Sequence, residues 1–212
     1  MKVVVFGATG KTGNEIVHQA LVKGHDVTAF VREPSKMMLE NEATSLTDRL
    51  RIVSGDIFDF DAVKQAVVGQ EAVICSLGSA SLGKTTVRGQ GTANIVKAME
   101  EEHVDRLLVV SAMGTGDSWS SLSFTNKLFY ATILRSSRQD HEAQEAAVKE
   151  SNLDWTILRP SGLTDDPATG KYAIGESVTA ESSRIARADV AQAMVNELEQ
   201  NAFVLTAVTI TN

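Results

Sequence analysis

Three glycines near the start of the chain have the spacing of a dinucleotide-binding turn. Gly7, Gly10 and Gly13 lie between an apolar run that ends at Phe6 and a helical pattern that ends at Gly24. In such a strand–turn–helix unit, glycines allow a sharp turn, a close approach of backbone to a pyrophosphate and close packing of helix on strand. The helix N-terminus then offers amide groups and a positive dipole end to the phosphates. We therefore expect the pyrophosphate to be held by Gly7, Thr9, Gly10, Lys11, Thr12 and Gly13.

The same residues also resemble part of the P-loop of nucleotide hydrolases. Gly10-Lys11-Thr12 matches the end of that motif, which requires four residues between its glycines. Here two residues separate Gly7 from Gly10, and Val5 stands where the first P-loop glycine would fall. The spacing therefore favours dinucleotide binding over nucleotide hydrolysis, although a glycine triplet can also form a purely structural turn.

A basic group follows the second apolar run, which we expect to be a strand over residues 26–31. In a dinucleotide fold this strand ends near the adenosine ribose, where an acid selects NAD and an arginine accommodates the 2′-phosphate of NADP. Arg32 offers a bidentate fork to that phosphate, and we expect Ser35 and Lys36 to support it. Glu33 could instead turn to the ribose, and Arg32 could be a solvated loop charge. We favour NADP(H) as the cofactor.

Small and polar residues end the later strands, and such strand ends line the ligand crevice of an open α/β sheet. We expect Asp56 and Ile57 to bracket the adenine, and Gly78 to lie under the nicotinamide ribose. Ser111 is the best candidate for a catalytic residue, because its hydroxyl can donate to a carbonyl or flavin atom beside the nicotinamide. Alternatively, Ser111 is a strand-terminal serine that bonds local backbone. Other candidates at these strand ends are Ser79, Met113, Arg159, Pro160 and Ser161, and of these we assign Pro160 to the cofactor.

Strand-like and helix-like apolar patterns alternate along the chain. We expect strands over residues 3–6, 26–31, 50–54, 72–77, 105–110, 154–158 and 203–210, and helices that end at 24 or span 59–68, 85–102, 122–150 (interrupted near 136–138) and 190–199. Asp59 and Asp189 are placed to cap two of these helices. The alternation predicts an α/β fold with a doubly wound, mostly parallel sheet and helices on both faces. We expect one domain over residues 1–212, with a small substrate-side region built from residues 111–125 and 159–185.

The composition is typical of an ordinary globular domain, with 43% hydrophobic and 22% charged residues in a chain of 212. The net charge of −7 argues against a nucleic-acid surface. The one cysteine, Cys75, lies in an apolar strand pattern, which argues against a disulfide framework or a metal knuckle. The first strand leaves no room for a signal peptide, and no apolar run approaches the ~18 residues of a membrane span. We therefore expect a cytoplasmic protein.

Short matching segments spread over nearly the whole chain resemble a known superfamily. They are residues 6–13, 31–33 with Ser35, 55–56, 69–74, 85–87, 91–96, 104–106, Ser111, 140–141, 150–151, 159–160 and 169–172. The chain resembles the short-chain dehydrogenase/reductase superfamily, specifically its atypical, NmrA-like and flavin-reductase branch, with most likeness to NADPH-flavin reductases of the biliverdin reductase B type. The glycine turn and Arg32 are the most specific matches. The resemblance implies a Rossmann core of seven or eight strands, NADPH as the hydride donor and a flavin as the acceptor.

Two departures from the superfamily bear on the reaction. The usual catalytic Tyr-x-x-x-Lys pair is absent, because Leu134 is the fourth residue after Tyr130; the flavin-reductase branch shares this departure. Ser161 stands where the biliverdin reductase B type carries a histidine, which argues against biliverdin as substrate and affects flavin less. A ketone reductase needs a positioned acid, whereas flavin reduction can take its proton from water. His141, beside Asp140 on what we expect to be an exposed polar helix face, is a weaker candidate for a proton donor.

The sequence therefore predicts an NADPH-dependent reductase that transfers hydride to a flavin or a similar conjugated ring, such as a quinone or a tetrapyrrole. The alternative is a non-catalytic, NmrA-like redox sensor that binds NAD(P) and acts through a protein partner, since missing catalytic pairs fit that function equally well. A sugar-nucleotide epimerase fits less well. We expect no metal, no nucleic acid and no membrane partner, and a monomer or a small homo-oligomer.

Overall fold

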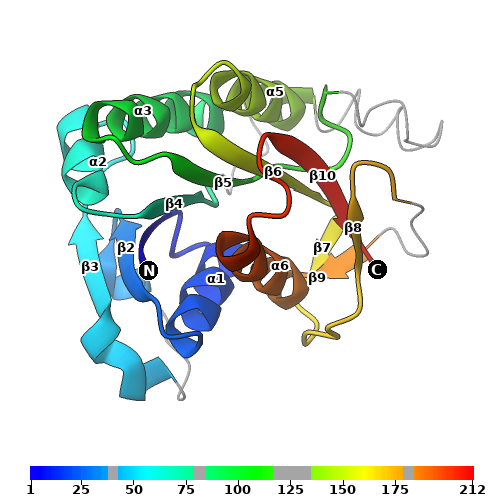
Figure 1. The fold of residues 1–212 in the computed structure, drawn as a ribbon, viewed down its shortest axis with the longest axis horizontal. Coiled ribbons are helices and arrows are strands. Elements are labelled where there is room, and N and C mark those ends of the chain that lie inside the picture. Colours follow the sequence, from blue (N-terminus) through cyan, green and yellow to red (C-terminus); the bar gives the residue numbers. More distant parts are fainter. Residues whose placement is uncertain (38–42, 79–84, 117–134, 179–183) are drawn as a thin grey trace.

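An eight-stranded sheet forms the centre of the computed structural model, which describes residues 1–37, 43–78, 85–116, 135–178 and 184–212 (Figure 1). The strand order is β3-β2-β1-β4-β5-β6-β10-β8, and only β8 pairs antiparallel to its neighbour. The strands are β1 (Lys2–Phe6), β2 (Asp26–Val31), β3 (Leu50–Ser54), β4 (Ala72–Cys75), β5 (Arg106–Val110), β6 (Asp154–Pro160), β8 (Ala173–Gly175) and β10 (Thr206–Thr211). The order reverses between β1 and β4, and such a reversal opens a crevice at the carboxyl ends of the strands.

Strand β1 shows why the sheet is covered on both faces. Val3 and Val5 belong to one hydrophobic core, and Val4 and Phe6 belong to the other. All four side chains are fully buried. Successive side chains of a strand point to opposite faces, so a continuous apolar run has to be covered twice.

Five helices in the described part of the chain cover the two faces (Figure 1). One face carries α1 (Lys11–Val22) and α6 (Arg187–Gln200), and the other carries α2 (Phe60–Val67), α3 (Val87–Glu102) and α5 (Arg135–Lys149). Smaller elements are the 3-10 helices η1 (Pro34–Lys36) and η2 (Ala43–Arg49), and a two-stranded sheet of β7 (Gly162–Thr164) and β9 (Arg184–Ala186). This confirms the predicted doubly wound α/β fold. None of the helices in the described ranges is long and apolar enough to cross a bilayer.

The predicted cap of α2 is confirmed, but that of α6 is wrong. The Asp59 carboxylate accepts a hydrogen bond from the Ala62 amide at 3.2 Å. Helix α6, however, begins at Arg187, and Asp189 lies buried inside its first turn. Its carboxylate instead accepts the amide hydrogens of Thr169 and Gly170 at 2.9 and 2.8 Å. A buried carboxylate needs donors, and the packed loop supplies them.

Several other predicted boundaries also differ from the structure: β4 ends at Cys75 and not at residue 77, β6 continues to Pro160, and α3 begins at Val87. Two further differences have a physical reason. Helix α5 runs without a break through residues 136–138, because packing against α3 outweighs the weak helix propensity of the serines. The last strand begins at Thr206, three residues later than predicted, because Leu205 adopts a left-handed φ of 57°.

A buried carboxylate connects α6 to the N-terminal ends of strands β5 and β6. The Glu197 side chain is 3% exposed and pairs with Arg106 at 2.7 Å. Its oxygens also accept hydrogen bonds from the Thr156 hydroxyl and from the Phe203 amide at 3.1 and 3.0 Å. All three contacts are made to the Glu197 carboxylate, in a site that excludes water. Removal of this carboxylate would therefore leave Arg106 buried without its counter-charge.

We predict that Glu197→Ala lowers the free energy of unfolding by about 3–5 kcal/mol, the usual cost of breaking a buried pair. Glu199→Ala is the matched control in the same helix, because the Glu199 side chain is 36% exposed; its effect should stay below about 1 kcal/mol. Urea denaturation measures both variants. Equal effects of the two substitutions would contradict the structural role of Glu197.

Candidate functional site

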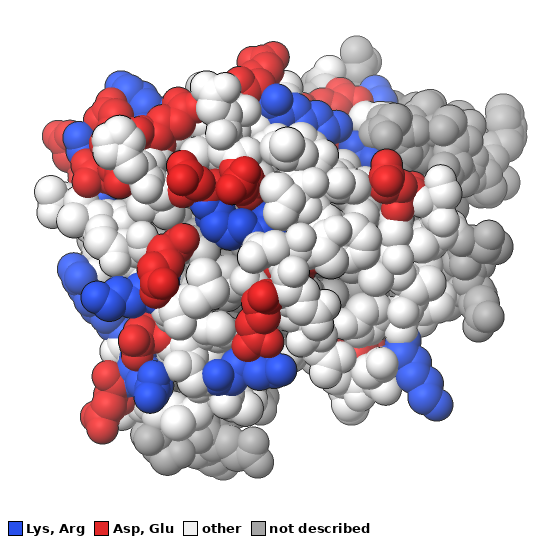
Figure 2. Space-filling view, in the orientation of Figure 1, with Lys and Arg blue, Asp and Glu red and all other residues white. Residues whose placement is uncertain are grey.

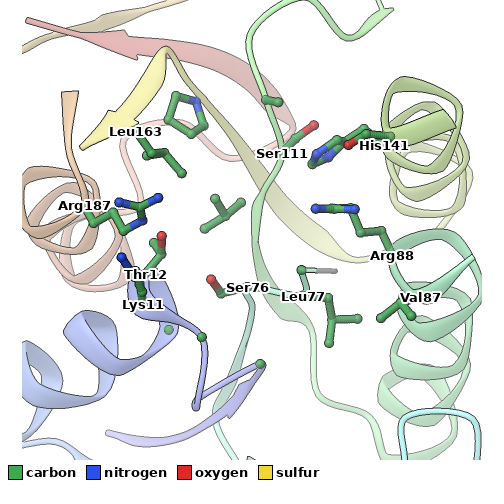
Figure 3. Close-up of a pocket in the computed structure, with 18 of the residues that line it drawn as sticks. Lys11, Thr12, Ser76, Leu77, Val87, Arg88, Ser111, His141, Leu163 and Arg187 are labelled. Atoms are coloured by element: carbon green, nitrogen blue, oxygen red, sulfur yellow. The ribbon is translucent and has the colours of Figure 1, made fainter. Parts of the chain in front are cut away.

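A cavity of about 960 Å³ opens at the carboxyl ends of the strands, beside the reversal between β1 and β4. Its lining comes from the glycine turn, from the ends of β2, β4, β5 and β6, and from α3, α5 and α6. Figure 3 shows residues from several of these elements around the cavity. Segments from both halves of the chain therefore meet at one place.

The glycine turn has the geometry that a bound pyrophosphate requires. Gly7 has a φ of +82°, a conformation that side chains disfavour. A Cβ on Gly13 would lie 2.1 Å from the Gly7 carbonyl oxygen, so only glycine lets α1 approach the turn this closely. Gly10 precedes the first residue of α1, and no side chain caps this helix and no acid lies in its first turn. The amide groups of the helix start remain available to an anion.

Two cations lie at this end of the cavity and share one carboxylate. Lys11 Nζ and Arg187 Nη1 each form an ion pair with Asp165, whose side chain is exposed. The hydrogen bond from Lys11 is the largest of the effects that lower the pKa of Asp165. Figure 3 shows Lys11 and Arg187 on the same side of the cavity, with Thr12 next to Lys11. Both cations can reach phosphate oxygens placed over the helix start.

The residues predicted to read the 2′-phosphate separate into two groups. Arg32 lines the cavity, is exposed and forms no hydrogen bond or ion pair with another described residue. Lys36 is paired with Glu33 at 2.8 Å, and this hydrogen bond lowers the pKa of the Glu33 carboxyl. Neither Ser35 nor Lys36 lies in the lining. Of the three residues, only Arg32 lines the cavity, and the Glu33 carboxylate is paired with Lys36.

The expected adenine residues also line the cavity. Ile57 is buried, and a Cβ on Gly91 of α3 would lie 2.7 Å from it, so the glycine makes room for this side chain. One oxygen of the Asp56 carboxylate accepts the Phe58 amide hydrogen at 2.9 Å, which fixes the side chain in a local turn. The other oxygen remains for a ring amine.

Ser111 lies at the end of β5 beside a buried ion pair. Its hydroxyl donates a hydrogen bond to Glu145 Oε1 at 2.7 Å. Arg159 donates to the same carboxylate from Nε at 2.9 Å and from Nη2 at 2.6 Å. Burial raises the pKa of Glu145. Its hydrogen bonds and the Arg159 charge lower this pKa by more than burial raises it, so the carboxyl has a pKa below its ordinary value. The Ser111 proton is thus held by Glu145, and its oxygen can still accept a bond from a ligand.

His141 is buried and lines the cavity, so the expectation of an exposed position was wrong. The reason is that α5 packs against α3, which covers the face that carries His141. Nδ1 lies 3.2 Å from Gln144 Oε1. Burial, and secondly the charge of Arg88, lower the pKa of His141 to about 4. The imidazole is therefore neutral at physiological pH.

The structure brings most of the predicted site residues together. Those that line the cavity are Gly7, Thr9, Gly10, Lys11, Thr12, Gly13, Arg32, Asp56, Ile57, Gly78, Ser111 and Pro160. The prediction did not assign Arg88 and Arg187 to the site, although each has one sequence signal, a cation in the first turn of a helix. Leu163 lies within the predicted substrate-side region but was not named as a site residue. Ser79, Tyr130 and the segment 117–125 of the expected substrate-side region lie outside the described residues. In the described ranges, no group of His, Cys, Asp and Glu side chains could hold a metal ion.

We predict that Gly13→Ala lowers the free energy of unfolding by about 1–3 kcal/mol, because the new Cβ overpacks the turn. NADPH affinity should fall by about tenfold or more as the start of α1 moves away from Gly7. Gly175→Ala in β8 is the control, since its Cβ would lie 3.6 Å from the nearest side-chain atom. Thermal unfolding and a fluorescence titration with NADPH check both variants. Normal NADPH affinity in Gly13→Ala would refute the close-approach argument.

We also predict that His141 makes the protein less stable in acid. The unfolded chain binds a proton near the ordinary histidine pKa of about 6.5, whereas folded His141 does so at about 4. The stability that the neutral ring provides is therefore complete above about pH 6.5, and it is lost as the pH falls toward 4, by up to about 3 kcal/mol. His141→Gln should flatten the pH dependence of the free energy of unfolding in this window. Urea denaturation across the window tests this, and an unaltered slope would be the contrary result.

The sequence matches a known protein family over most of its length. The model of a family described as NAD(P)H-binding matches residues 7–201. Protein YwnB of Bacillus subtilis (strain 168) is 31% identical over 213 residues, which cover 94% of this chain and 92% of YwnB. The chloroplastic protein At2g34460 of Arabidopsis thaliana is 30% identical over 207 residues, which cover 94% of this chain and 72% of that protein. Since that relative is chloroplastic, a cytoplasmic location stays a prediction.

Solved structures share the fold. ChuY from Escherichia coli O157:H7, described as an anaerobilin reductase, superposes with a TM-score of 0.80 at 25% identity, over 100% of this chain and 97% of ChuY. A short-chain dehydrogenase/reductase from Veillonella parvula, solved in complex with NADP, gives a TM-score of 0.82 at 20% identity, over 100% of this chain and 94% of its own. The expected resemblance and the expected class of cofactor are confirmed. The chain belongs to the NAD(P)H-binding family and has the Rossmann fold of the atypical short-chain dehydrogenases/reductases.

Proposed function

We propose that this protein is an NADPH-dependent reductase that transfers a hydride to a flavin or a similar conjugated ring. The observation that carries the proposal is the extent of the cavity. It continues from the glycine turn and Arg32 to Ser111, His141 and Leu163, and so it has room for a planar acceptor beside the nicotinamide. Its volume of about 960 Å³ is at the upper end of the usual range for ligand sites.

The state of the two candidate proton donors supports an acceptor of this kind. Ser111 already donates its proton to Glu145, and His141 is neutral because its pKa is about 4. A ketone would need a proton from the protein as the alkoxide develops. A flavin accepts the hydride of nicotinamide C4 at N5, which leaves NADP⁺ and a reduced flavin anion that takes its proton from water. The protein mainly has to orient the two rings.

Comparison with known proteins supports the cofactor and widens the choice of acceptor. Arg32 favours NADPH, and the Veillonella parvula structure was solved with NADP. ChuY is described as an anaerobilin reductase, which makes a tetrapyrrole-like ring a second acceptor to test beside flavins. Both acceptors are extended conjugated rings.

The direct test is the oxidation of NADPH by the purified protein, followed by the loss of reduced-nicotinamide absorbance, with and without FMN and beside NADH. We expect flavin-dependent turnover with a preference for NADPH. Tight NADPH binding without turnover on flavins, quinones or bilins would instead favour a redox sensor that acts through a protein partner.

The coenzyme preference should depend on Arg32. Arg32→Ala is expected to weaken NADPH binding by about tenfold or more, through loss of charge-assisted bonds to the 2′-phosphate, and to alter NADH binding little. Arg51→Ala, which removes an exposed charge from the neighbouring strand β3, is the matched control. Dissociation constants for both coenzymes decide the matter. If Arg32→Ala keeps the wild-type preference, the assignment of this residue is wrong.

A further inference from the structure

The charged residues that line the cavity are almost all cations, although the chain as a whole is acidic. Its ionic lining residues are five cations and one carboxylate: Lys11, Arg32, Arg88, Arg138, Arg187 and Asp56. The net charge of the chain is −7, and acidic and basic side chains are interspersed on the face shown in Figure 2. The excess of cations is thus a property of the cavity.

These cations lie on different sides of the cavity. Lys11 and Arg187 lie at the helix start that would hold the pyrophosphate, and Arg32 lies at the end of β2 where the 2′-phosphate is expected. Arg88 projects from α3 on the opposite side, together with His141 from α5 and facing the part that Ser111 lines (Figure 3). Lys11, Arg187 and Arg32 are therefore placed for the phosphates of the cofactor. Arg88 lies on the side of the cavity proposed for the acceptor.

Arg88 is held in place but retains donors for a ligand. Its side chain is 12% exposed, and Nη1 lies 3.5 Å from Asp140 Oδ2. The two Asp140 oxygens also accept the backbone amide hydrogens of Arg88 and Gly89 at 3.2 and 2.9 Å. Arg88 Nε is buried without a hydrogen-bond partner among the described residues. Asp140 thus orients the guanidinium and balances part of its charge, and N–H groups are left over.

We propose that Arg88 binds an anionic group of the acceptor, a phosphate or a carboxylate carried by the conjugated ring. This inference rests on the proposed function, because it places the cofactor on the other side of the cavity. A partly desolvated guanidinium gains most from a charged acceptor oxygen, and its planar fork fits the oxygens of a phosphate or a carboxylate. His141 beside it is neutral and adds no competing charge. Arg88 therefore selects anionic over neutral acceptors with the same ring.

Two pairs of probes separate the anion from the ring. FMN and riboflavin share a flavin and differ in the phosphate, while biliverdin and its dimethyl ester share a bilin and differ in two carboxylates. Binding of each probe to the NADP⁺-loaded protein is measured by flavin fluorescence or bilin absorbance, so no turnover is needed. We expect the anionic member of at least one pair to bind about tenfold more tightly than its neutral counterpart. Added salt should reduce this ratio, and the responding pair identifies a phosphate or carboxylate ligand.

Variants test whether Arg88 causes the ratio between the affinities of the anionic and the neutral probe. In Arg88→Gln the ratio should fall to near one, and in Arg88→Lys, which keeps the charge without the fork, it should be intermediate. Arg51→Gln removes an exposed charge outside the cavity lining and should keep the wild-type ratio. Thermal unfolding and NADPH affinity confirm that each variant is folded; if Arg88→Gln does not fold, Arg88→Lys and the salt dependence decide.

Three results would overturn the proposal: no binding of any probe, a ratio near one in the wild-type protein for both pairs, or a ratio that Arg88→Gln leaves as it is. A ratio that depends on Arg88, without oxidation of NADPH by any probe, would refute the reductase and leave the anion site standing.

Discussion

The part of the cavity that Ser111 lines, where we propose that the acceptor binds, depends on the buried ion pair between Glu145 and Arg159. Both side chains are at most 3% exposed, and two hydrogen bonds join them. Charges without water are costly unless they stay paired, so α5 and the end of β6 are held together at this point. The Ser111 hydroxyl joins the same carboxylate from β5. Three elements, α5, β5 and β6, are thereby held together at this part of the cavity. A site fixed in this way could orient the two rings of the proposed reaction without further ordering on binding.

Charge is distributed in this molecule according to where its ligands are expected. The cavity collects cations in an acidic chain, and each cation is oriented by a carboxylate or left open to solvent. Asp165 joins Lys11 to Arg187 over the glycine turn, and Asp140 orients Arg88 on the opposite side. An anionic dinucleotide and an anionic acceptor can therefore share one cavity, because separate cations face each of them.

The sequence predicted the parts of the site that follow from local spacing. The glycine turn, Arg32 and the Asp56-Ile57 pair lie within or directly after a strand, so their neighbours in sequence are also their neighbours in space. The predictions failed where the burial or the hydrogen bonds of a side chain depend on a segment that is distant in the sequence. His141 was expected to be exposed and is covered by α3, and Asp189 was expected to cap its own helix and binds the amides of residues 169–170. Neither α3 nor residues 169–170 lie near enough in the sequence to be recognised as partners of these side chains.

The sequence by itself determined the doubly wound fold and the class of cofactor. Both follow from local patterns, the apolar periodicity of each element and the spacing of the glycines, which involve only residues close together in the chain. Val3 to Phe6 had to be covered on both faces, and Gly13 had to follow the turn closely. Only the tertiary structure decided that His141 and Arg88 line the same cavity as Ser111, which the sequence had already placed at a strand end. Ser111, His141 and Arg88 come from three elements whose contact depends on the packing of α3 and α5 on the sheet. Burial and neighbouring charge set the protonation of such groups, and both arise only when distant segments meet.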